Sequence, residues 1–396
     1  MKQYTITVED QPYPGRTVWL CPGTGNGDGS ASRPFRVQSP DDFDNLIKGY
    51  HGDNHKGSVA FRLMPGWYHT RGCWNHHGYA TLWSGDALLG EAGVDIIIKD
   101  PVTQTDGKER PDVHILSAGS PYIYANRCRV EGVAIWGANI RPGLFVTSGL
   151  RCYGSYHKVS SVRVFNVYGS YEPVQTASGN IPLEAFGISF DGGGVVDDCC
   201  VDASQPKAYV SAFSGAKGGV SFRNCDAIGE NQHAAFTIYS NCSVINSNAV
   251  GFAYGIYNDS EVVKNALVTG GTFECGRVGI GVVSVNRDYK SGIYVRDADF
   301  RSLDVLLELI GKDGMFDDIL LDSCRYEYGK TGKATLFSAD AKDVSLVRFR
   351  NCVVPDQLRV NNPNKVPYSV EGMMSWSGKR FLDTKPQGLA AMVEEA

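Results

Sequence analysis

Phe222-Arg223-Asn224-Cys225-Asp226-Ala227 holds the pattern that decides the fold: apolar, any, turn residue, small, any, apolar. Phe349-Arg350-Asn351-Cys352-Val353-Val354 repeats it. Aligned on the turn residue, nine copies recur about every two dozen residues, which indicates an internal repeat. Each turn residue is of a type that tolerates left-handed or turn conformations. These residues are Gly132, Ser161, Asp198, Asn224, Asn246, Gly270, Asp297, Ser323 and Asn351.

In the aligned copies, the position two residues before the turn residue and the position three residues after it are always apolar. The position directly after the turn residue holds a small or medium-sized side chain. A repeat of this length with strand-like alternation is one turn of a solenoid, which buries its apolar face only when neighbours stack on it. The Leu-x-x-Leu-x-Leu frame of leucine-rich repeats is absent, so we predict an all-β, single-stranded parallel β-helix. The column before the turn is Val130, Val159, Val196, Phe222, Val244, Val268, Val295, Leu321 and Phe349, and the column after it is Ile135, Val164, Val201, Ala227, Ala249, Phe273, Phe300, Tyr326 and Val354.

The first strand of each coil is visible at residues 186–190, 236–239, 254–257 and 279–283. Because side chains alternate along a strand, one set of positions should face outward. These positions are Gly187, Thr237, Gly255 and Gly279, followed by Ser189, Tyr239, Tyr257 and Gly281.

Both ends of such a solenoid need a cap. Ser39-Pro40-Asp41-Asp42 has the capping serine, first-turn proline and acid of a helix start, and Phe43, Leu46 and Ile47 follow at helical spacing. We therefore predict a short helix within an N-terminal cap at 1–56, a β-helix at 57–355 and a C-terminal cap or tail at 356–396.

Bulk properties limit the classes of partner. The net charge of −5 gives no electrostatic reason to expect nucleic acid or an anionic membrane, and no run of about eighteen apolar residues exists to span a bilayer. Met1-Lys2-Gln3-Tyr4 begins without the apolar segment of a secretion signal. We expect a cytoplasmic or phage-associated protein, or a secreted one whose signal has been removed.

The cysteine count is odd, at eleven, without metal-site spacing. Cys199, Cys225, Cys324 and Cys352 fall in the inward small column, where we expect buried thiols. A bridge between neighbouring coils, Cys199 to Cys225 or Cys324 to Cys352, is the alternative, because stacked Cα atoms lie within disulfide range.

The N-terminal part carries a fold signature. Gly25-Asn26-Gly27-Asp28-Gly29-Ser30 precedes Arg33-Pro34-Phe35, and Pro65-Gly66-Trp67-Tyr68 and Leu89-Gly90-Glu91-Ala92-Gly93 follow. This succession resembles the opening of the right-handed parallel β-helix proteins of the pectate lyase superfamily, which have the pectin lyase-like fold. The resemblance implies a right-handed solenoid, and members include polysaccharide lyases, glycoside hydrolases, epimerases, esterases and viral adhesin spikes.

Motifs of particular subfamilies are mostly missing. Of the polygalacturonase-like motifs only Asp197-Asp198 matches, and Asp198 already belongs to the turn column. Calcium-dependent pectate lyases cluster carboxylates on outward first-strand positions, since calcium takes six to eight oxygens. The outward positions here hold no acid cluster, so we predict no cofactor and find no support for Ca²⁺.

The longest loop, residues 168–184, is expected to flank the site because long ordered loops in regular repeats are often functional. We expect Tyr171, Glu172, Glu184 and Asp259 to contact substrate. Tyr239 and Tyr257 should project from neighbouring first strands, either as a platform for sugar rings or as a ladder that stabilises the sheet.

Three residue types nearby suit β-elimination from a uronate. Arg277 would neutralise the sugar carboxylate, His233 would remove the adjacent proton, and Tyr239 or Tyr257 would assist the leaving oxygen. Hydrolysis would instead need two carboxylates, for which the candidates are Glu184, Glu230 and Asp259.

We therefore predict a carbohydrate-active enzyme, foremost a polysaccharide lyase that cleaves an acidic, uronate-containing glycan by β-elimination. A glycoside hydrolase is the enzymatic alternative. The non-enzymatic alternative is a glycan-binding or structural β-helix such as a phage tailspike-like adhesin. The expected partner is a polysaccharide or oligosaccharide, with no nucleic acid and no membrane, and the oligomeric state stays open between monomer and trimer.

Overall fold

The computed structural model describes residues 15–50, 58–70, 73–74, 77–78, 82–98, 127–137, 148–167, 170–176, 179–183, 185–204, 210–215, 218–258, 265–284, 290–329, 333–381 and 383. The chain forms two compact units. Of the described residues, those up to Val220 together with Cys225–Ile228 form the N-terminal unit, and Ser221–Asn224 together with those from Gly229 onward form the C-terminal unit.

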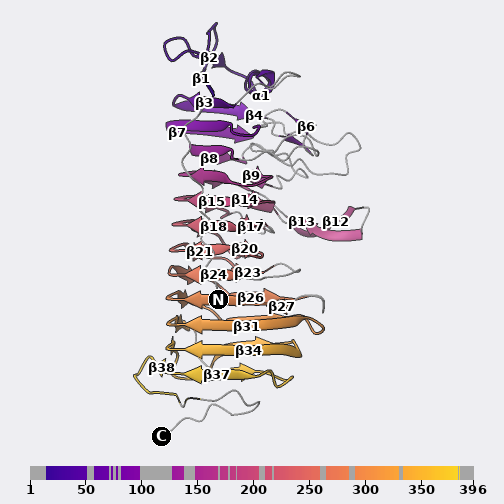
Figure 1. Cartoon of the computed structure of the whole chain (residues 1–396), viewed down its shortest axis with the longest axis vertical. Coiled ribbons are helices and arrows are strands. Elements are labelled where there is room, and N and C mark those ends of the chain that lie inside the picture. Colours follow the sequence, from indigo (N-terminus) through magenta and orange to yellow (C-terminus); the bar gives the residue numbers. More distant parts are fainter. Residues whose placement is uncertain are drawn as a thin grey trace. The chain divides into compact units, whose positions relative to one another are not determined.

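Within each unit the chain winds through coils whose strands pair in parallel with their equivalents in the next coil (Figure 1). In the N-terminal unit, for example, β14 (Ala185–Phe190) leads to β15 (Gly194–Asp197) and β16 (Cys200–Asp202). In the C-terminal unit, β26 (Val278–Val283) leads to β28 (Ile293–Arg296) and β29 (Asp299–Arg301). This succession is the predicted β-helix.

The remaining coil strands of the N-terminal unit are β1 (Arg16–Pro22), β2 (Phe35–Val37), β3 (Val59–Leu63), β4 (Gly66–Thr70), β7 (Ala87–Ile98), β8 (Arg129–Trp136), β9 (Ser148–Cys152), β10 (His157–Ser160), β11 (Arg163–Phe165), β17 (Val210–Gly215) and β19 (Asp226–Ile228). Strand β18 (Val220–Arg223) contains the boundary between the units.

The remaining strands of the C-terminal unit are β20 (Ala234–Ile238), β21 (Ser243–Ile245), β22 (Asn248–Val250), β23 (Tyr254–Tyr257), β24 (Ala266–Thr269), β25 (Thr272–Glu274), β27 (Lys290–Ser291), β30 (Val305–Ile310), β31 (Met315–Asp322), β32 (Arg325–Glu327), β33 (Ala334–Ala339), β34 (Asp343–Arg350), β35 (Val353–Val354), β36 (Leu358–Asn361), β37 (Tyr368–Glu371) and β38 (Met374–Ser375).

The turn column has the conformation that its residue types predict. All nine anchor residues have a positive φ, between 48° and 68°. The apolar columns on either side are buried throughout, with no member more than 4% exposed. The repeat therefore buries one continuous apolar column on each side of a left-handed bend, and the prediction of a parallel β-helix is confirmed.

The predicted orientation of three glycines is wrong. A Cβ on Gly187 would meet Val201, one on Gly255 would meet Phe273, and one on Gly279 would meet Leu303, all of them fully buried. These glycines consequently face the interior.

In β23 the next residue also faces inward. Ile256 pairs with Phe236, whose ring contacts the core ring of Phe222 at 5.9 Å between centroids. Two consecutive inward residues break strict alternation, so the outward positions of β23 are Tyr254 and Tyr257, three residues apart. The pairs in register with them are Ala234 and Thr237, Val278 and Gly281, Val305 and Glu308, and Thr335 and Ser338.

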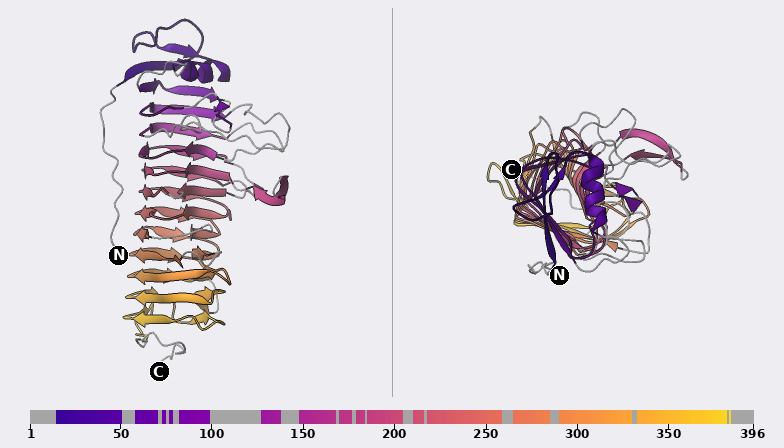
Figure 2. Two further views of the ribbon diagram at one scale, coloured as in Figure 1. Left: turned by 45° about the vertical axis from the view of Figure 1, so that its right-hand side comes forward. Right: turned by 90° about the horizontal axis from the view of Figure 1, so that it is seen from above.

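The predicted cap helix is present as α1 (Pro40–Gly49), which lies across the first coils of the N-terminal unit when seen from above (Figure 2). Ser39 and Asp42 form a reciprocal capping box. Phe43 and Ile47 are buried, and the ring of Phe43 packs 5.6 Å from that of Tyr68. The apolar stripe of the helix thus covers the open end of the core.

At the other end, parallel pairing continues beyond residue 355. Strand β37 pairs with β34, and β38 pairs with β35. Gly372 has a φ of 60°, and Val370 and Met373 beside it are buried. The segment predicted as a cap or tail therefore begins with a tenth copy of the repeat.

The long loop at residues 168–184 contains an antiparallel pair, β12 (Ser170–Thr176) and β13 (Gly179–Leu183), which extends to the side of the N-terminal unit (Figure 1). A shorter antiparallel pair consists of β5 (Cys73–Trp74) and β6 (His77–Gly78). Both hairpins are insertions between coil strands.

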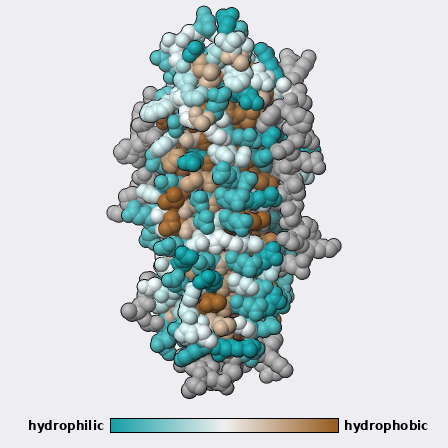
Figure 3. All heavy atoms as spheres, turned by 90° about the vertical axis from the view of Figure 1, so that its left-hand side faces the viewer, coloured by the Kyte–Doolittle hydropathy of each residue, from teal (hydrophilic) through white to brown (hydrophobic). Residues whose placement is uncertain are grey.

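Ten cysteines of the described core are free thiols, and nine of them are buried. This agrees with the expectation of buried thiols, because Cys199, Cys225, Cys324 and Cys352 are each at most 2% exposed. Outside the core the surface is chiefly hydrophilic on the face shown in Figure 3, with small hydrophobic groups between polar ones. No helix in the described ranges is long and apolar enough to cross a bilayer.

Candidate active site

The first-strand sheet of the C-terminal unit carries a group of five side chains that we call the tyrosine–arginine cluster: His233, Tyr254, Tyr257, Arg277 and Glu308. His233 directly precedes β20, and Arg277 directly precedes β26. The two tyrosines occupy the ends of β23, and Glu308 lies in β30. The β-helix therefore assembles the cluster from four successive coils.

Hydrogen bonds connect three of the five side chains. The hydroxyl of Tyr254 donates to Oε2 of Glu308 at 3.0 Å and accepts from Nη2 of Arg277 at 2.5 Å. Arg277 also forms an ion pair with Glu308, at 3.3 Å between Nη2 and Oε2. The phenol proton is thus directed toward a carboxylate, while a guanidinium faces the phenol oxygen.

Aromatic contacts fix the other members. The ring of His233 lies edge-on to Tyr257, with centroids 4.6 Å apart, and to Tyr254 at 5.6 Å. The two tyrosine rings are 4.9 Å apart. Cζ of Arg277 lies 4.9 Å from the centroid of the Tyr254 ring, in cation–π range. The rings of the cluster therefore support one another and leave little rotational freedom.

Space for these rings depends on Gly281, which lies beside Tyr257 in the next coil. A Cβ at this position would be 2.9 Å from Cε1 of Tyr254 and 3.1 Å from Cδ2 of Tyr257. The missing side chain lets Tyr254 lean across β26 and reach Glu308.

Burial and neighbouring charges set the protonation states. Burial, and then the positive charge of Arg277, lower the pKa of His233 to about 4, so this imidazole is neutral near pH 7. Burial, and then the negative charge of Glu308, raise the pKa of Tyr254 above its ordinary value, against an opposing effect of Arg277. The cluster therefore combines a neutral imidazole, a neutral phenol and an arginine.

This arrangement matches the needs of proton transfer beside a carboxylate. Arg277 is about half exposed, with 55% of its side-chain surface accessible, and a guanidinium has five N–H donors. It can bind an incoming carboxylate while it still contacts Tyr254. His233 can accept a proton, and Tyr254 can donate one.

The structure brings three of the predicted site residues, His233, Arg277 and Tyr257, into this cluster. Glu230 lies exposed in the turn that precedes His233, where its backbone N–H bonds Oε1 of Gln232. Tyr239 follows the end of β20 and is half-buried. The strand register places Thr237, rather than Tyr239, beside Tyr257.

The predicted substrate contacts are placed only in part. Tyr171 and Glu172 belong to β12 in the N-terminal unit, and their side chains are not among those described. Glu184 and Asp259 lie outside the described residues.

Sequence reasoning missed Tyr254 and Glu308. Strict alternation assigned Tyr254 to the interior, and Glu308 follows Tyr254 by 54 residues. An outward spacing of three along the first strands, rather than two, would have paired Tyr254 with Tyr257 and Val305 with Glu308.

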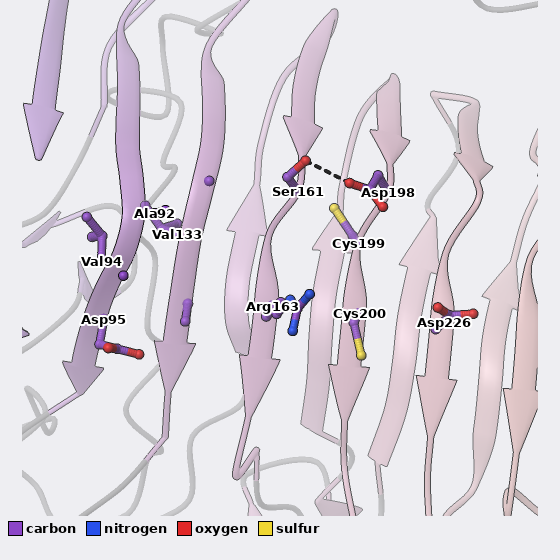
Figure 4. Close-up of a pocket in the computed structure, with 13 residues that line it drawn as sticks. Ala92, Val94, Asp95, Val133, Ser161, Arg163, Asp198, Cys199, Cys200 and Asp226 are labelled. Atoms are coloured by element: carbon purple, nitrogen blue, oxygen red, sulfur yellow. Dashed lines mark hydrogen bonds between the residues drawn. The ribbon is translucent and has the colours of Figure 1, made fainter. Parts of the chain in front are cut away.

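A hollow of about 450 Å³ lies in the N-terminal unit near the turns between second and third strands (Figure 4). Its polar lining includes Asp95, Arg163 and Asp226, and the hydroxyl of Ser161 donates to Oδ2 of Asp198 at 2.8 Å. Asp198 has a φ of 52°, so this half of the Asp197-Asp198 pair belongs to the bend. Across the described residues of both units, no group of three His, Cys, Asp or Glu side chains is arranged to hold a metal ion.

The sequence matches no family model, and no curated protein is detectably similar to it. Solved structures are similar in fold. The mannuronan C-5 epimerase A-module of Azotobacter vinelandii superposes with a TM-score of 0.54 at 12% identity, over 84% of this chain and 94% of the module. The catalytic domain of a GH87 α-1,3-glucanase, solved in complex with tetrasaccharides, superposes with a TM-score of 0.50 at 12% identity, over 93% of this chain and 70% of that domain. The chain has the right-handed parallel β-helix fold of the pectin lyase-like proteins.

Proposed function

We propose that the tyrosine–arginine cluster binds an acidic glycan and cleaves it by β-elimination. The observation that supports this proposal most strongly is the pair of contacts made by the hydroxyl of Tyr254, to Arg277 and to Glu308. They place a phenol proton and a cation beside a neutral imidazole in one cluster, in which Tyr254 is only 6% exposed and Arg277 is the most solvent-accessible member. Elimination from a uronate needs these three groups.

In the proposed reaction, Arg277 binds the carboxylate of the uronate and makes the neighbouring C5 proton more acidic. His233 accepts that proton as the C5–H bond breaks. The electron pair forms a double bond between C4 and C5 while the C4–O bond breaks, and Tyr254 protonates the departing oxygen. Glu308, which accepts the phenol hydrogen bond, orients Tyr254 and helps to return a proton to it.

The proton donor in this reaction differs from the one expected from the sequence. We assign the proton donor to Tyr254 instead of Tyr239 or Tyr257, because Tyr254 contacts both the cation and the carboxylate. Tyr257 is better suited to pack against a sugar ring, since its ring is held edge-on between His233 and Tyr254.

Hydrolysis fits the described side chains less well. A glycoside hydrolase needs two carboxylates on either side of the scissile bond, whereas the cluster contributes Glu308, already paired with Arg277. Glycan binding without cleavage is supported by the tyrosine pair alone, and it is the second candidate function.

A glycan as the ligand is also supported by the two similar structures, whose names refer to mannuronan and to an α-1,3-glucan. C5 is the carbon at which an epimerase inverts and a lyase deprotonates, so both reactions would begin with the same step.

One assay separates these outcomes. The full chain is incubated in D₂O with a panel of uronate polymers, and ultraviolet absorbance, reducing ends and deuterium at C5 are recorded. Absorbance of a conjugated, unsaturated uronate product supports elimination. Deuterium at C5 without that absorbance indicates epimerisation, reducing ends alone indicate hydrolysis, and binding without any product indicates an adhesin.

The matched control is a pair of arginine variants. Arg277→Gln should abolish product formation. Arg301→Gln should leave it unchanged, because Arg301 pairs with Asp299 on the third strand of its coil and has a comparable exposure of 46%. Equal activity of both variants would refute the role of Arg277.

A further inference from the structure

The outward face of the first strands continues beyond the tyrosine–arginine cluster within the C-terminal unit. Glu308 is followed in register by Ser338 in β33 and by Asn361 in β36. The second row of outward positions consists of Val305 in β30, Thr335 in β33 and Arg359 in β36, which also pair in register. A second arginine therefore lies on the same face as Arg277, nearer the C-terminus.

Hydrogen bonds to the preceding coil hold this region in place. Nε of Arg359 donates to Oγ1 of Thr335 at 2.7 Å, and Nδ2 of Asn361 donates to Oγ of Ser338 at 2.9 Å. Both acceptors are neutral hydroxyls. The aliphatic part of Arg359 is thereby fixed across a strand pair, and among the described residues no acceptor bonds its terminal N–H groups.

Arg359 lacks the carboxylate partner that several other arginines of this unit have. Among the described residues, Arg296, whose Nε also donates to a threonine hydroxyl, and Arg325, which lies over the ring of Trp376, resemble it in this respect. Arg277, Arg301, Arg348 and Arg350 each form an ion pair with a carboxylate. Arg359 is exposed, and in the part of the unit that the structure describes no carboxylate lies within ion-pair distance of it. An exposed, pre-oriented guanidinium without a counter-ion is suited to an anionic ligand.

We infer that Arg359 and Asn361 form a second subsite, which binds the carboxylate of another uronate in the chain that occupies the tyrosine–arginine cluster. This inference rests on the proposed function. Three inter-strand steps separate the coil that begins at Arg277 from Arg359, or about 14 Å at the usual strand spacing. An extended glycan advances by about one strand spacing per sugar, so the two arginines would bind sugars three units apart.

The subsite makes a prediction about ligand length. A uronate trisaccharide that reaches Arg277 is too short to reach Arg359, whereas a tetrasaccharide reaches both. The test measures the binding of defined uronate tri- and tetrasaccharides to the full chain and to the variants Arg359→Gln and Arg301→Gln by calorimetry at two salt concentrations.

We expect the wild type to bind the tetrasaccharide about tenfold more tightly than the trisaccharide, as one charge-assisted contact would give. Arg359→Gln should remove that gain, weaken the salt dependence of tetrasaccharide binding and leave trisaccharide binding unchanged. Arg301→Gln should behave like the wild type.

The failures of the two proposals are distinguishable. If the wild type binds neither oligosaccharide, the proposed function is refuted and the subsite with it. If the wild type binds both equally, or if Arg359→Gln keeps the gain from the fourth sugar, the subsite is refuted while binding at the cluster stands.

Discussion

The hydroxyl of Tyr254 donates a hydrogen bond of 3.0 Å to Glu308, although 54 residues separate them in sequence. The solenoid makes this contact possible because Tyr254 and Glu308 lie in coils that are two steps apart, with Gly281 between them. The contact orients the one phenol that also touches Arg277, so it connects the stacking of coils directly to the chemistry of the cluster.

Replacing Tyr254 by phenylalanine should reduce turnover of an acidic glycan by about a hundredfold, since the proton donor is lost while the ring remains. Product formation measured by ultraviolet absorbance tests this. Tyr294→Phe is the control, because Tyr294 also bonds a carboxylate, Asp322, but on the second strand of its coil. A Tyr254→Phe variant with normal turnover would remove Tyr254 from the mechanism.

Gly281→Ala should impair glycan binding and turnover without replacing any group that reacts. The added methyl would lie 2.9 Å from the ring of Tyr254, which would have to move away from Glu308. Gly276→Ala is the matched variant, because the nearest atoms to its methyl are 3.9 Å away. Affinity for a uronate oligosaccharide is the readout, and equal affinities of the two variants would contradict the proposed role of Gly281.

The pKa of His233 should respond to Arg277. It is lowered to about 4 from an ordinary value of 6.5, by burial first and by the charge of Arg277 second. The neutral base is therefore present above about pH 4, and the acidic limb of the activity profile should fall there instead of near pH 6.5. In Arg277→Gln the pKa of His233 should rise, because the repulsion of the protonated form is removed.

A nuclear magnetic resonance titration of the His233 ring in both proteins measures this shift without any need for catalysis. An unchanged His233 pKa in Arg277→Gln would show that burial alone controls it, and the electrostatic part of the proposed site would then be wrong.

The repeat could be predicted from the sequence because its signal is local. Asn224 and Asn351 each indicate a left-handed bend. The apolar positions beside them can be recognised from the local sequence, without knowledge of distant contacts. The cap helix was predictable for the same reason, since Ser39 and Asp42 cap it within one turn.

The site was harder to predict, because it depends on which residues of a first strand face outward. Gly255 and Ile256 both face the core, and this single departure from alternation placed Tyr254 on the outer side of β23, where its side chain is 6% exposed beneath the rest of the cluster. Glu308 comes into contact with Tyr254 only through the register of three coils, and sequence spacing alone does not fix such a register.

The left-handed bends provide a test of the fold that is independent of any activity. Asn351 has a φ of 52°, where a residue with a Cβ and no side-chain compensation is disfavoured by about 1 kcal/mol. Asn351→Ala should lower the free energy of unfolding by about that amount, and Asn351→Gly should be nearly neutral. Denaturant unfolding of the two variants decides between these outcomes, and equal stabilities would argue against a strained bend.

Buried His157 in the N-terminal unit should make the protein less stable in mild acid. Its Nδ1 accepts the backbone N–H of Cys128 at 3.2 Å, and its Nε2 bonds the carbonyl of Tyr153. Burial lowers the pKa of His157 from 6.5 to about 4, against the effect of these hydrogen bonds. Between these two pH values the unfolded chain binds the proton and the folded chain does not, so stability falls as the pH decreases from about 6.5 toward 4.

The expected loss from His157 alone is about 2 kcal/mol between pH 7 and pH 5. His157→Gln removes the titrating group, so its free energy of unfolding should depend less on pH by that amount, even if the variant is less stable at pH 7. His233→Gln should remove a similar contribution from the C-terminal unit, since the pKa of His233 is lowered in the same direction. Urea unfolding of the three proteins at both pH values measures these differences. If His157→Gln shows the same pH dependence as the wild type, His157 is accessible to protons in the folded state, and the tight packing described around it is incorrect.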